Sequence, residues 1–485
     1  MTEEDRASAE IPYERRLIRR LSLLEAVTIG VGASIGAGIF TVIGLTVWEA
    51  GIASILTFSL CGLAAALVGY SYVKLSSIFP ESGASYTYVA RAFNNPSIVF
   101  ITGCTLWFAY IIACATYAVG FANYLSYLLN WNLHVLSNSL HVFYGVSDVY
   151  LSLLDELYTP PFNKKVMILV LTLLFTGLNI VGVSETGKTQ TTMVFGKVLI
   201  LLLFITVGLM EVLSRPKLGL SGVTPTVLLP QTYTFFIPLL LPFRNPLWGF
   251  FTAASTIFIA FEGFDLIPTT GEELKNPRVI GKAIFITITI VFIIYMFTLI
   301  TLMGLVPWYL SGASEAPLAE AMNQTWLGGW GSFLLGIGGV LSTASAFNAT
   351  LFGSSRLMYA MSREGVLPKK LSVLTKRGHI PYISLLLGSS LCLILAMTEN
   401  LEFVASMTSV AFMVIFILVS ISNLKLKSQT NSKPFIPIAA IALLSLFLFF
   451  VKPYIMVAFL LWLGITALVY LLFRGLQARQ GKKPS

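Results

Sequence analysis

Charged residues are scarce in this sequence. Asp, Glu, Lys and Arg make up 11% of the 485 residues, whereas 56% are hydrophobic, and the mean hydropathy is +0.83. A soluble domain is about a quarter charged, since polar side chains have to cover its surface. The composition therefore excludes an ordinary soluble protein and indicates several apolar runs of about 20 residues, each long enough to cross a lipid bilayer.

Cysteine and histidine are also rare, and neither is clustered. The four cysteines include no CxxC pair, and the three histidines lack the spacing of metal ligands. This pattern does not favour a disulfide framework or a zinc site. Because the spans also lack an HExxH motif and paired aspartates, we expect no metal, no cofactor and no enzyme activity.

The apolar runs predict an all-α membrane protein with twelve transmembrane helices. Ser22 and Glu25 have the spacing of a capping box at the start of the first span. The loop 74–96 is either a short amphipathic helix or a plain connector, and long outer loops are expected at 129–163 and 214–246. The predicted spans are 24–48, 52–73, 97–128, 164–183, 191–213, 247–270, 282–306, 330–360, 382–397, 402–422, 434–451 and 453–473.

Basic residues are distributed unequally between the two sides of these spans. With the N-terminus inside, the positive-inside rule places both termini in the cytoplasm. The net charge of +9 follows from this bias, so we expect a multi-pass protein of the cell membrane whose partner is the lipid bilayer and not nucleic acid. Only six of the 31 basic residues then lie outside, namely Lys164, Lys165, Arg215, Lys217, Arg244 and Lys452.

Span 1 is rich in glycine over the segment 30–40. Each glycine costs a helix up to about 1 kcal/mol relative to alanine. A dinucleotide fingerprint is excluded because the GxGxxG spacing is absent. Two interpretations remain for this span: a helix-packing face of small residues at Gly32 and Gly36, or an unwound segment in the middle of the bilayer.

Span 6 carries Glu262 and Asp265 on either side of Gly263, within an apolar run. A charged side chain at this depth costs about 2.5–3.5 kcal/mol on insertion scales, so such residues usually face a cavity or a partner. Interrupted segments at matching positions of two halves of a chain point to a transporter binding site. The pair of spans therefore favours the unwound interpretation of span 1.

An interrupted helix can recognise an amino acid through its backbone. The freed N–H groups at the start of one half-helix attract a carboxylate, and the freed carbonyls at the end of the other attract an ammonium group. An α-amino acid carries both groups one carbon apart. The sequence therefore predicts a carrier of amino acids or related small amines.

Several motifs resemble the amino acid–polyamine–organocation transporter superfamily. They follow one another in the expected order and cover most of the chain. The matching segments are 32–40, 79–83 with Tyr86 and Tyr88, 261–265 with 272–277, and 355–368. The resemblance implies one membrane transport domain (1–485) with five spans in 24–213, five inverted spans in 247–423, and two further spans in 434–473.

The resemblance also implies a substrate site at the two interruptions. The substrate carboxylate would bind the amides near Gly36, Ala37 and Gly38, and the ammonium would bind carbonyls at Ser34, Ile259 and Glu262. The segment also includes Ile35 and Gly263. The side-chain pocket would be formed by Tyr110, Cys114 and Ser406.

Two positions depart from the pattern of many members. Ile259 stands where many have an aromatic gate, and Glu262 stands where many have an apolar residue. Glu262 would carry a proton, favour a cationic substrate, or form hydrogen bonds within the unwound segment.

Lys197 in span 5 is open to two interpretations. Its ammonium group either reaches the inner headgroups or occupies the place that sodium takes in sodium-coupled relatives of similar sequence. In the second case it would contact Gly32 and either Ser342 or Ser345. A lysine in apolar surroundings can release its proton, which predicts proton coupling or coupling-free exchange, with Asp265 as an alternative proton carrier.

The leading hypothesis is a proton-coupled amino acid transporter that works by alternating access. A carrier of polyamines or cationic amino acids, or an amino acid antiporter, is the alternative in the same class. A membrane sensor of amino acids is the alternative in another class.

Overall fold

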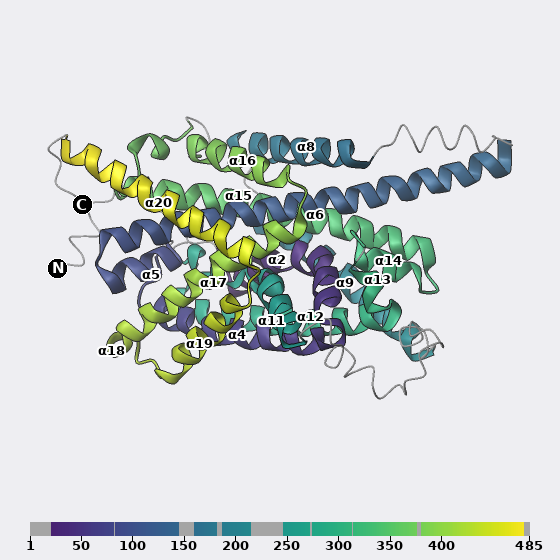
Figure 1. The fold of residues 1–485 in the computed structure, drawn as a ribbon, viewed down its shortest axis with the longest axis horizontal. Helices are drawn as coiled ribbons and strands as arrows, with labels where there is room; N and C mark the ends of the chain where they lie inside the picture. The colour runs from purple at the N-terminus through teal and green to yellow at the C-terminus, as the bar shows by residue number, and fades with distance from the viewer. Residues whose placement is uncertain are drawn as a thin grey trace.

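The computed structural model describes residues 21–81, 83–144, 160–181, 187–214, 246–271, 274–312, 314–375 and 380–479. This part of the chain contains helices and no β-strand. Figure 1 shows an elongated bundle, with α5 (Ala84–Phe93) and α18 (Lys427–Thr430) at one end and α13 (Trp308–Ser311) and α14 (Pro317–Asn323) at the other. Residues 145–159 of the first expected outer loop and 215–245 of the second lie outside the described residues, as do Ser82, Glu272 and Glu273.

The first span consists of three pieces. Helix α2 (Leu23–Ser34) begins at the predicted capping box, in which the Ser22 amide donates to the Glu25 carboxylate at 2.7 Å and the Glu25 amide donates back to the Ser22 hydroxyl at 3.4 Å. The span continues as the π-helix η2 (Gly38–Val42) and ends as α3 (Ile43–Ala50). After the short turn η3 (Gly51–Ala53), α4 (Ser54–Ser76) returns through the bundle.

The loop 74–96, expected on the inner side, contains a short helix and is not a plain connector. Helix α5 ends at Asn94, whose φ of 45° lies in the left-handed region that terminates helices. The Asn95 side chain then accepts the Ser97 amide at 3.0 Å, which stabilises the start of α6 (Pro96–Tyr144). Helices α8 (Pro160–Val181) and α9 (Gly187–Ser214) follow.

The predicted span 97–128 agrees with the apolar segment Pro96–Leu129. The helix itself is longer than the span, because α6 has 49 residues and continues to Tyr144, into the segment expected as an outer loop. The segment 129–144 is more polar than the span, yet it contains no proline or glycine, and polarity alone does not end a helix. Figure 1 shows α6 projecting beyond the bundle at the end where α13 and α14 lie.

The second half of the chain begins with an interrupted span. It contains α11 (Pro246–Ile257) and the 3₁₀ turns η5 (Phe258–Phe261), η6 (Phe264–Leu266) and η7 (Pro268–Thr270). The turn η8 (Pro277–Val279) leads into α12 (Ile280–Leu305), and α15 (Gly328–Arg363) follows α13 and α14. The remaining elements are η9 (Lys369–Ser372), α16 (Tyr382–Ala396), α17 (Leu401–Lys425), α19 (Phe435–Phe449) and α20 (Pro453–Arg479).

Length and composition identify this as a multi-pass membrane protein. Within the described ranges, nine helical segments are long and apolar enough to cross a membrane, and α16 and α19 are shorter apolar helices. Exposed leucines such as Leu213, Leu461 and Leu471 cover the outside of α9 and α20, as expected for helices that face lipid. The count of twelve spans and the inverted repeat stay predictions.

One charged cluster links α3, α17 and the turn between α19 and α20. Lys452, in the turn between α19 and α20, places its ammonium 2.5 Å from Glu49 of α3 and 2.5 Å from Glu402 of α17. Partial burial alone would lower the pKa of Lys452, but the two carboxylates outweigh it and raise the pKa above the ordinary lysine value.

Candidate functional site

The first interruption lies in the middle of span 1. Helix α2 ends at Ser34, Ile35 leaves the helical conformation (φ −77°, ψ 84°), and η2 begins at Gly38. The Gly36 amide turns back and donates to the Ser34 carbonyl at 2.9 Å. Among the described residues, the amides of Ala37 and Gly38 find no acceptor. These two N–H groups therefore remain available to an anionic group.

The second interruption lies in span 6. After η5, Glu262 adopts an extended conformation (φ −71°, ψ 165°) and Gly263 has a φ of +111°. Such a φ is accessible to glycine and strained for other residues. The chain then continues in 3₁₀ turns and does not resume an α-helix before Ile280.

The two interruptions touch each other through their backbones. A Cβ atom at Gly38 would lie 2.6 Å from the Cα of Ala260, and a Cβ atom at Gly263 would lie 2.6 Å from the Ser34 amide nitrogen. Both distances are shorter than the contacts that Cβ atoms make in proteins. Glycine at these two positions is therefore what allows the unwound segments to cross.

Tyr295 of α12 joins the two unwound segments. Its hydroxyl lies 2.6 Å from the Ser34 carbonyl and 2.9 Å from the Ala260 carbonyl. A buried carbonyl without a donor costs about 1–3 kcal/mol, so this residue stabilises both breaks. Tyr295 was not predicted from the sequence, although a hydroxyl in the middle of the apolar run Ile280–Leu305 was a usable signal.

Span 10 supplies further support to the break in span 6. The Ile259 amide donates to the Ser409 hydroxyl at 2.8 Å, and this hydroxyl donates to the Thr256 carbonyl at 2.9 Å. Ser406, which we expected in the side-chain pocket, lies 3.1 Å from the Thr256 hydroxyl. Ser409 was not identified from the sequence, although it lies one helical turn from Ser406.

The carbonyls expected to bind an ammonium group differ in whether they already accept a hydrogen bond within the protein. The Ser34 carbonyl accepts from Gly36 and from Tyr295, and the Ile259 carbonyl accepts the Glu262 amide at 3.2 Å. In the described part of the chain, the Glu262 carbonyl accepts no hydrogen bond. Of the three, only the Glu262 carbonyl is left without an internal donor.

The two carboxylates of span 6 have contrasting surroundings. Asp265 is 1% exposed and accepts hydrogen bonds from the Gly263 amide and the Tyr110 hydroxyl, both at 3.0 Å. Glu262 is 3% exposed, and neither of its carboxylate oxygens has a hydrogen-bond partner among the described residues. An unsatisfied buried carboxylate is costly. Asp265 is thus a structural partner of the break, whereas Glu262 is free to bind a proton or a ligand.

Lys197 of α9 lies buried beside the first interruption. Its ammonium donates to the carbonyls of Gly32 at 2.5 Å and Ile35 at 2.8 Å, and to the Ser345 hydroxyl of α15 at 3.2 Å. The Ser342 hydroxyl donates to the same Ile35 carbonyl at 2.7 Å. The side chain is 2% exposed. It therefore joins spans 1, 5 and 8, and it does not extend to the headgroups.

Tyr110 and Cys114 of α6 contact different neighbours. Tyr110 reaches Asp265, whereas the Cys114 thiol lies 3.7 Å from the Phe347 carbonyl of α15. Every residue predicted for the substrate site is buried. The structure is thus closed around the interruptions.

The comparisons with known proteins agree with this architecture. A family model described as amino acid permease matches residues 21–473. The chain is 31% identical to an uncharacterized protein of Methanocaldococcus jannaschii, MJ0609 (86% of this chain, 84% of the relative), and 27% identical to the branched-chain amino acid permease BcaP of Bacillus subtilis (95% and 94%). It is also 27% identical to the cationic amino acid transporter 3, mitochondrial, of Arabidopsis thaliana (85% and 63%). The chain belongs to the amino acid permease family.

Proposed function

We propose that this protein is a secondary active transporter that moves amino acids across the cell membrane by alternating access, coupled to protons. Membership of the amino acid permease family supports transport of amino acids. Relatives that cover most of this chain are named as permeases of branched-chain amino acids and as transporters of cationic amino acids. We infer the coupling to protons from the contacts of Lys197. We infer the cell membrane from the unequal distribution of basic residues.

The observation that carries the proposal is the pair of crossed, unwound segments. The free amides of Ala37 and Gly38 suit the α-carboxylate of the substrate. The Glu262 carbonyl, which has no internal donor, suits the α-ammonium group. The backbone then recognises what all amino acids share, and Tyr110 and Cys114 contribute to the surroundings of the side chain.

Lys197 is the proposed coupling residue. When protonated, its ammonium group holds the end of α2 to α15 through Gly32, Ile35 and Ser345. Loss of the proton removes the charge that strengthens these contacts. Spans 1, 5 and 8 are then free to separate, which links proton release to the opening of the site.

Uptake into proteoliposomes tests the transport function. The purified protein is reconstituted, and uptake of a panel of labelled amino acids is measured with and without an imposed pH gradient. Saturable uptake that rises when the outside is more acidic supports the proposal. Binding of an amino acid without any uptake would favour a sensor.

A carrier of cationic substrates is the second candidate, and Glu262 favours it. A buried carboxylate without a hydrogen-bond partner would attract a substrate ammonium or guanidinium group. In competition assays, Glu262→Gln should weaken inhibition by lysine or a diamine more than inhibition by leucine. Glu320→Gln, at an exposed position of α14, is the matched control. Equal effects on both classes would argue against a selectivity role.

We further propose twelve spans in a five-plus-five inverted arrangement, with both termini in the cytoplasm. The described segments fit this topology, because α5 and α18, expected inside, lie at the opposite end from α13 and α14, expected outside. In a variant without native cysteines, a membrane-impermeant maleimide should label Glu315→Cys in intact cells and fail to label Lys427→Cys. The reverse pattern would invert the topology.

A further inference from the structure

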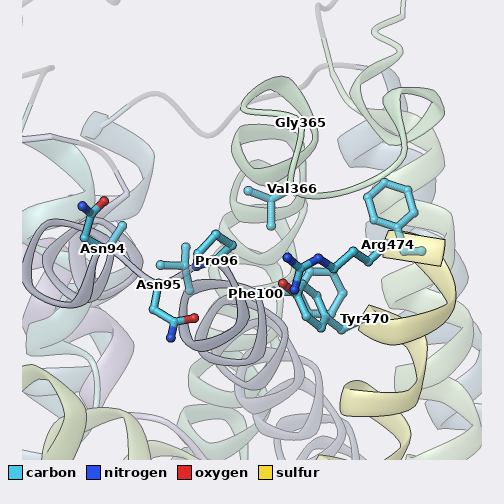
Figure 2. A pocket seen from close by; sticks show the side chains of 11 residues that line it. Asn94, Asn95, Pro96, Phe100, Gly365, Val366, Tyr470 and Arg474 are labelled. Atoms are coloured by element: carbon cyan, nitrogen blue, oxygen red, sulfur yellow. The ribbon is translucent and has the colours of Figure 1, made fainter. Parts of the chain in front are cut away.

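A cavity lies far from the interruptions, at the end of the molecule where α5 is found. It has a volume of about 230 Å³ and is lined by the α5–α6 corner, the loop after α15 and the last described turns of α20. Figure 2 shows the side chains from these three elements converging on it. The walls contributed by Val99, Phe100, Val366, Tyr470 and Phe473 are apolar or aromatic.

The polar side chains among the described residues that line this cavity are one cation, Arg474, the carboxamides of Asn94 and Asn95, and the phenol of Tyr470. Figure 2 shows the Arg474 side chain pointing from α20 into the cavity, toward Phe100 and Val366, with Asn94 and Asn95 on the other side. Among the described residues, no acidic side chain lines the cavity, and Arg474 forms no ion pair with a carboxylate. The arrangement therefore combines a positive charge and amide donors with an apolar wall.

The cavity lies where the apolar part of α20 ends. Arg474 is the first charged residue after the apolar run that begins at Pro453, so it stands where that helix leaves the hydrocarbon. Leu468, Leu471 and Leu472, one or two turns earlier, are 56%, 64% and 60% exposed, as expected for side chains in contact with lipid. The cavity thus opens at the level of phospholipid headgroups.

We propose that this cavity binds the headgroup of an anionic phospholipid. Arg474 would pair with the lipid phosphate, Asn94 and Asn95 would donate to its oxygens or to headgroup hydroxyls, and the first acyl carbons would lie on Phe100 and Tyr470. A zwitterionic lipid fits less well, because its ammonium group would approach Arg474. Basic pockets at the cytoplasmic ends of transmembrane helices are suited to such headgroups.

Lipid binding to the full-length protein tests the site. Native mass spectrometry of detergent-purified protein gives the dissociation constant of the first bound lipid, using dioleoyl phosphatidylglycerol or dioleoyl phosphatidylcholine as the probe. Arg474→Gln should weaken binding of phosphatidylglycerol about fivefold, the loss expected for one basic side chain near an anionic surface. Arg474→Lys should retain most of the affinity, and binding of phosphatidylcholine should not change.

Two further variants separate the site from a general effect of charge. Lys427→Gln removes an exposed cation at the same end of the molecule and should bind phosphatidylglycerol like the wild type. Val366→Phe fills the cavity and keeps Arg474, so it should weaken binding. Equal affinities of the wild type and Arg474→Gln, full binding by Val366→Phe, or displacement of the lipid by inorganic phosphate would each overturn the proposal.

Discussion

Replacing Lys197 with methionine is the most direct test of proton coupling. The change keeps the length of the side chain and removes its charge. The Ile35 carbonyl would still accept from Ser342 at 2.7 Å. The Gly32 carbonyl would lose its donor, since the Gly36 amide donates to Ser34 and does not complete the helix.

The expected free-energy cost comes from the Gly32 carbonyl. A buried acceptor left without a donor costs about 1–3 kcal/mol, which would shift the balance between closed and open conformations about 5- to 150-fold. The variant should therefore still fold and bind substrate, with the closed state less populated. What it should lose is the group that carries the proton.

Accumulation in proteoliposomes measures this loss. A gradient of one pH unit is worth about 1.4 kcal/mol per proton, enough for a tenfold accumulation of substrate. The wild type should approach this ratio, whereas Lys197→Met should only equilibrate its substrate and continue to exchange it for unlabelled substrate. Lys282→Met, at an exposed position near the start of α12, is the control. Gradient-driven accumulation by Lys197→Met equal to that of the wild type would refute the role of Lys197.

Three further predictions concern the stability of the site and of the charged cluster at Lys452. Gly263→Ala should abolish folding or lower the melting temperature strongly, because its φ is +111° and its Cβ would lie 2.6 Å from a backbone nitrogen, whereas Gly196→Ala meets nothing within 4 Å and should be neutral. Tyr295→Phe should reduce stability by about 1–3 kcal/mol in thermal unfolding, since the one hydroxyl proton shared by the two buried carbonyls is lost and the Ser34 carbonyl keeps only the Gly36 amide; an unchanged melting temperature would contradict the bridging role. Lys452→Met should lower the melting temperature, because Glu49 would stay largely buried without its cation. In the wild type, the raised pKa of Lys452 means that its contribution is fully present below the ordinary lysine pKa and is lost only as the pH rises through the raised value. Melting between pH 6 and pH 9 should therefore show no loss from this group.

Local sequence signals were sufficient for features that depend on neighbouring residues. The capping box at Ser22 and Glu25 and the boundary between the last two spans, predicted at 451–453, are both present where the sequence predicts them. The interruption of span 1 was also predictable, because its clustered glycines weaken a helix and span 6 carries two carboxylates and a glycine at the matching position. The C-terminal end of α6 was not predictable, because a helix that leaves the membrane can continue into water without a proline or glycine to indicate where it ends.

The site itself was only partly predictable. The contact between Lys197 and Gly32 was expected from the resemblance, but the second carbonyl, that of Ile35, became evident only in the structure. The sequence presented Glu262 and Asp265 as two similar carboxylates. The fold distinguishes them, because Tyr110, more than 150 residues earlier in the chain, reaches one and not the other.

The sequence by itself determined that this chain crosses a membrane, where its first span breaks, and which residue types lie at the breaks. These properties follow from hydropathy and from backbone preferences, which act over a few residues. Only the tertiary structure decided which freed backbone groups stay free. Tyr295 and Lys197 occupy the carbonyls of Ser34, Gly32 and Ile35 from other spans, and hydrogen bonds between spans depend on packing across the bundle, which no local pattern encodes.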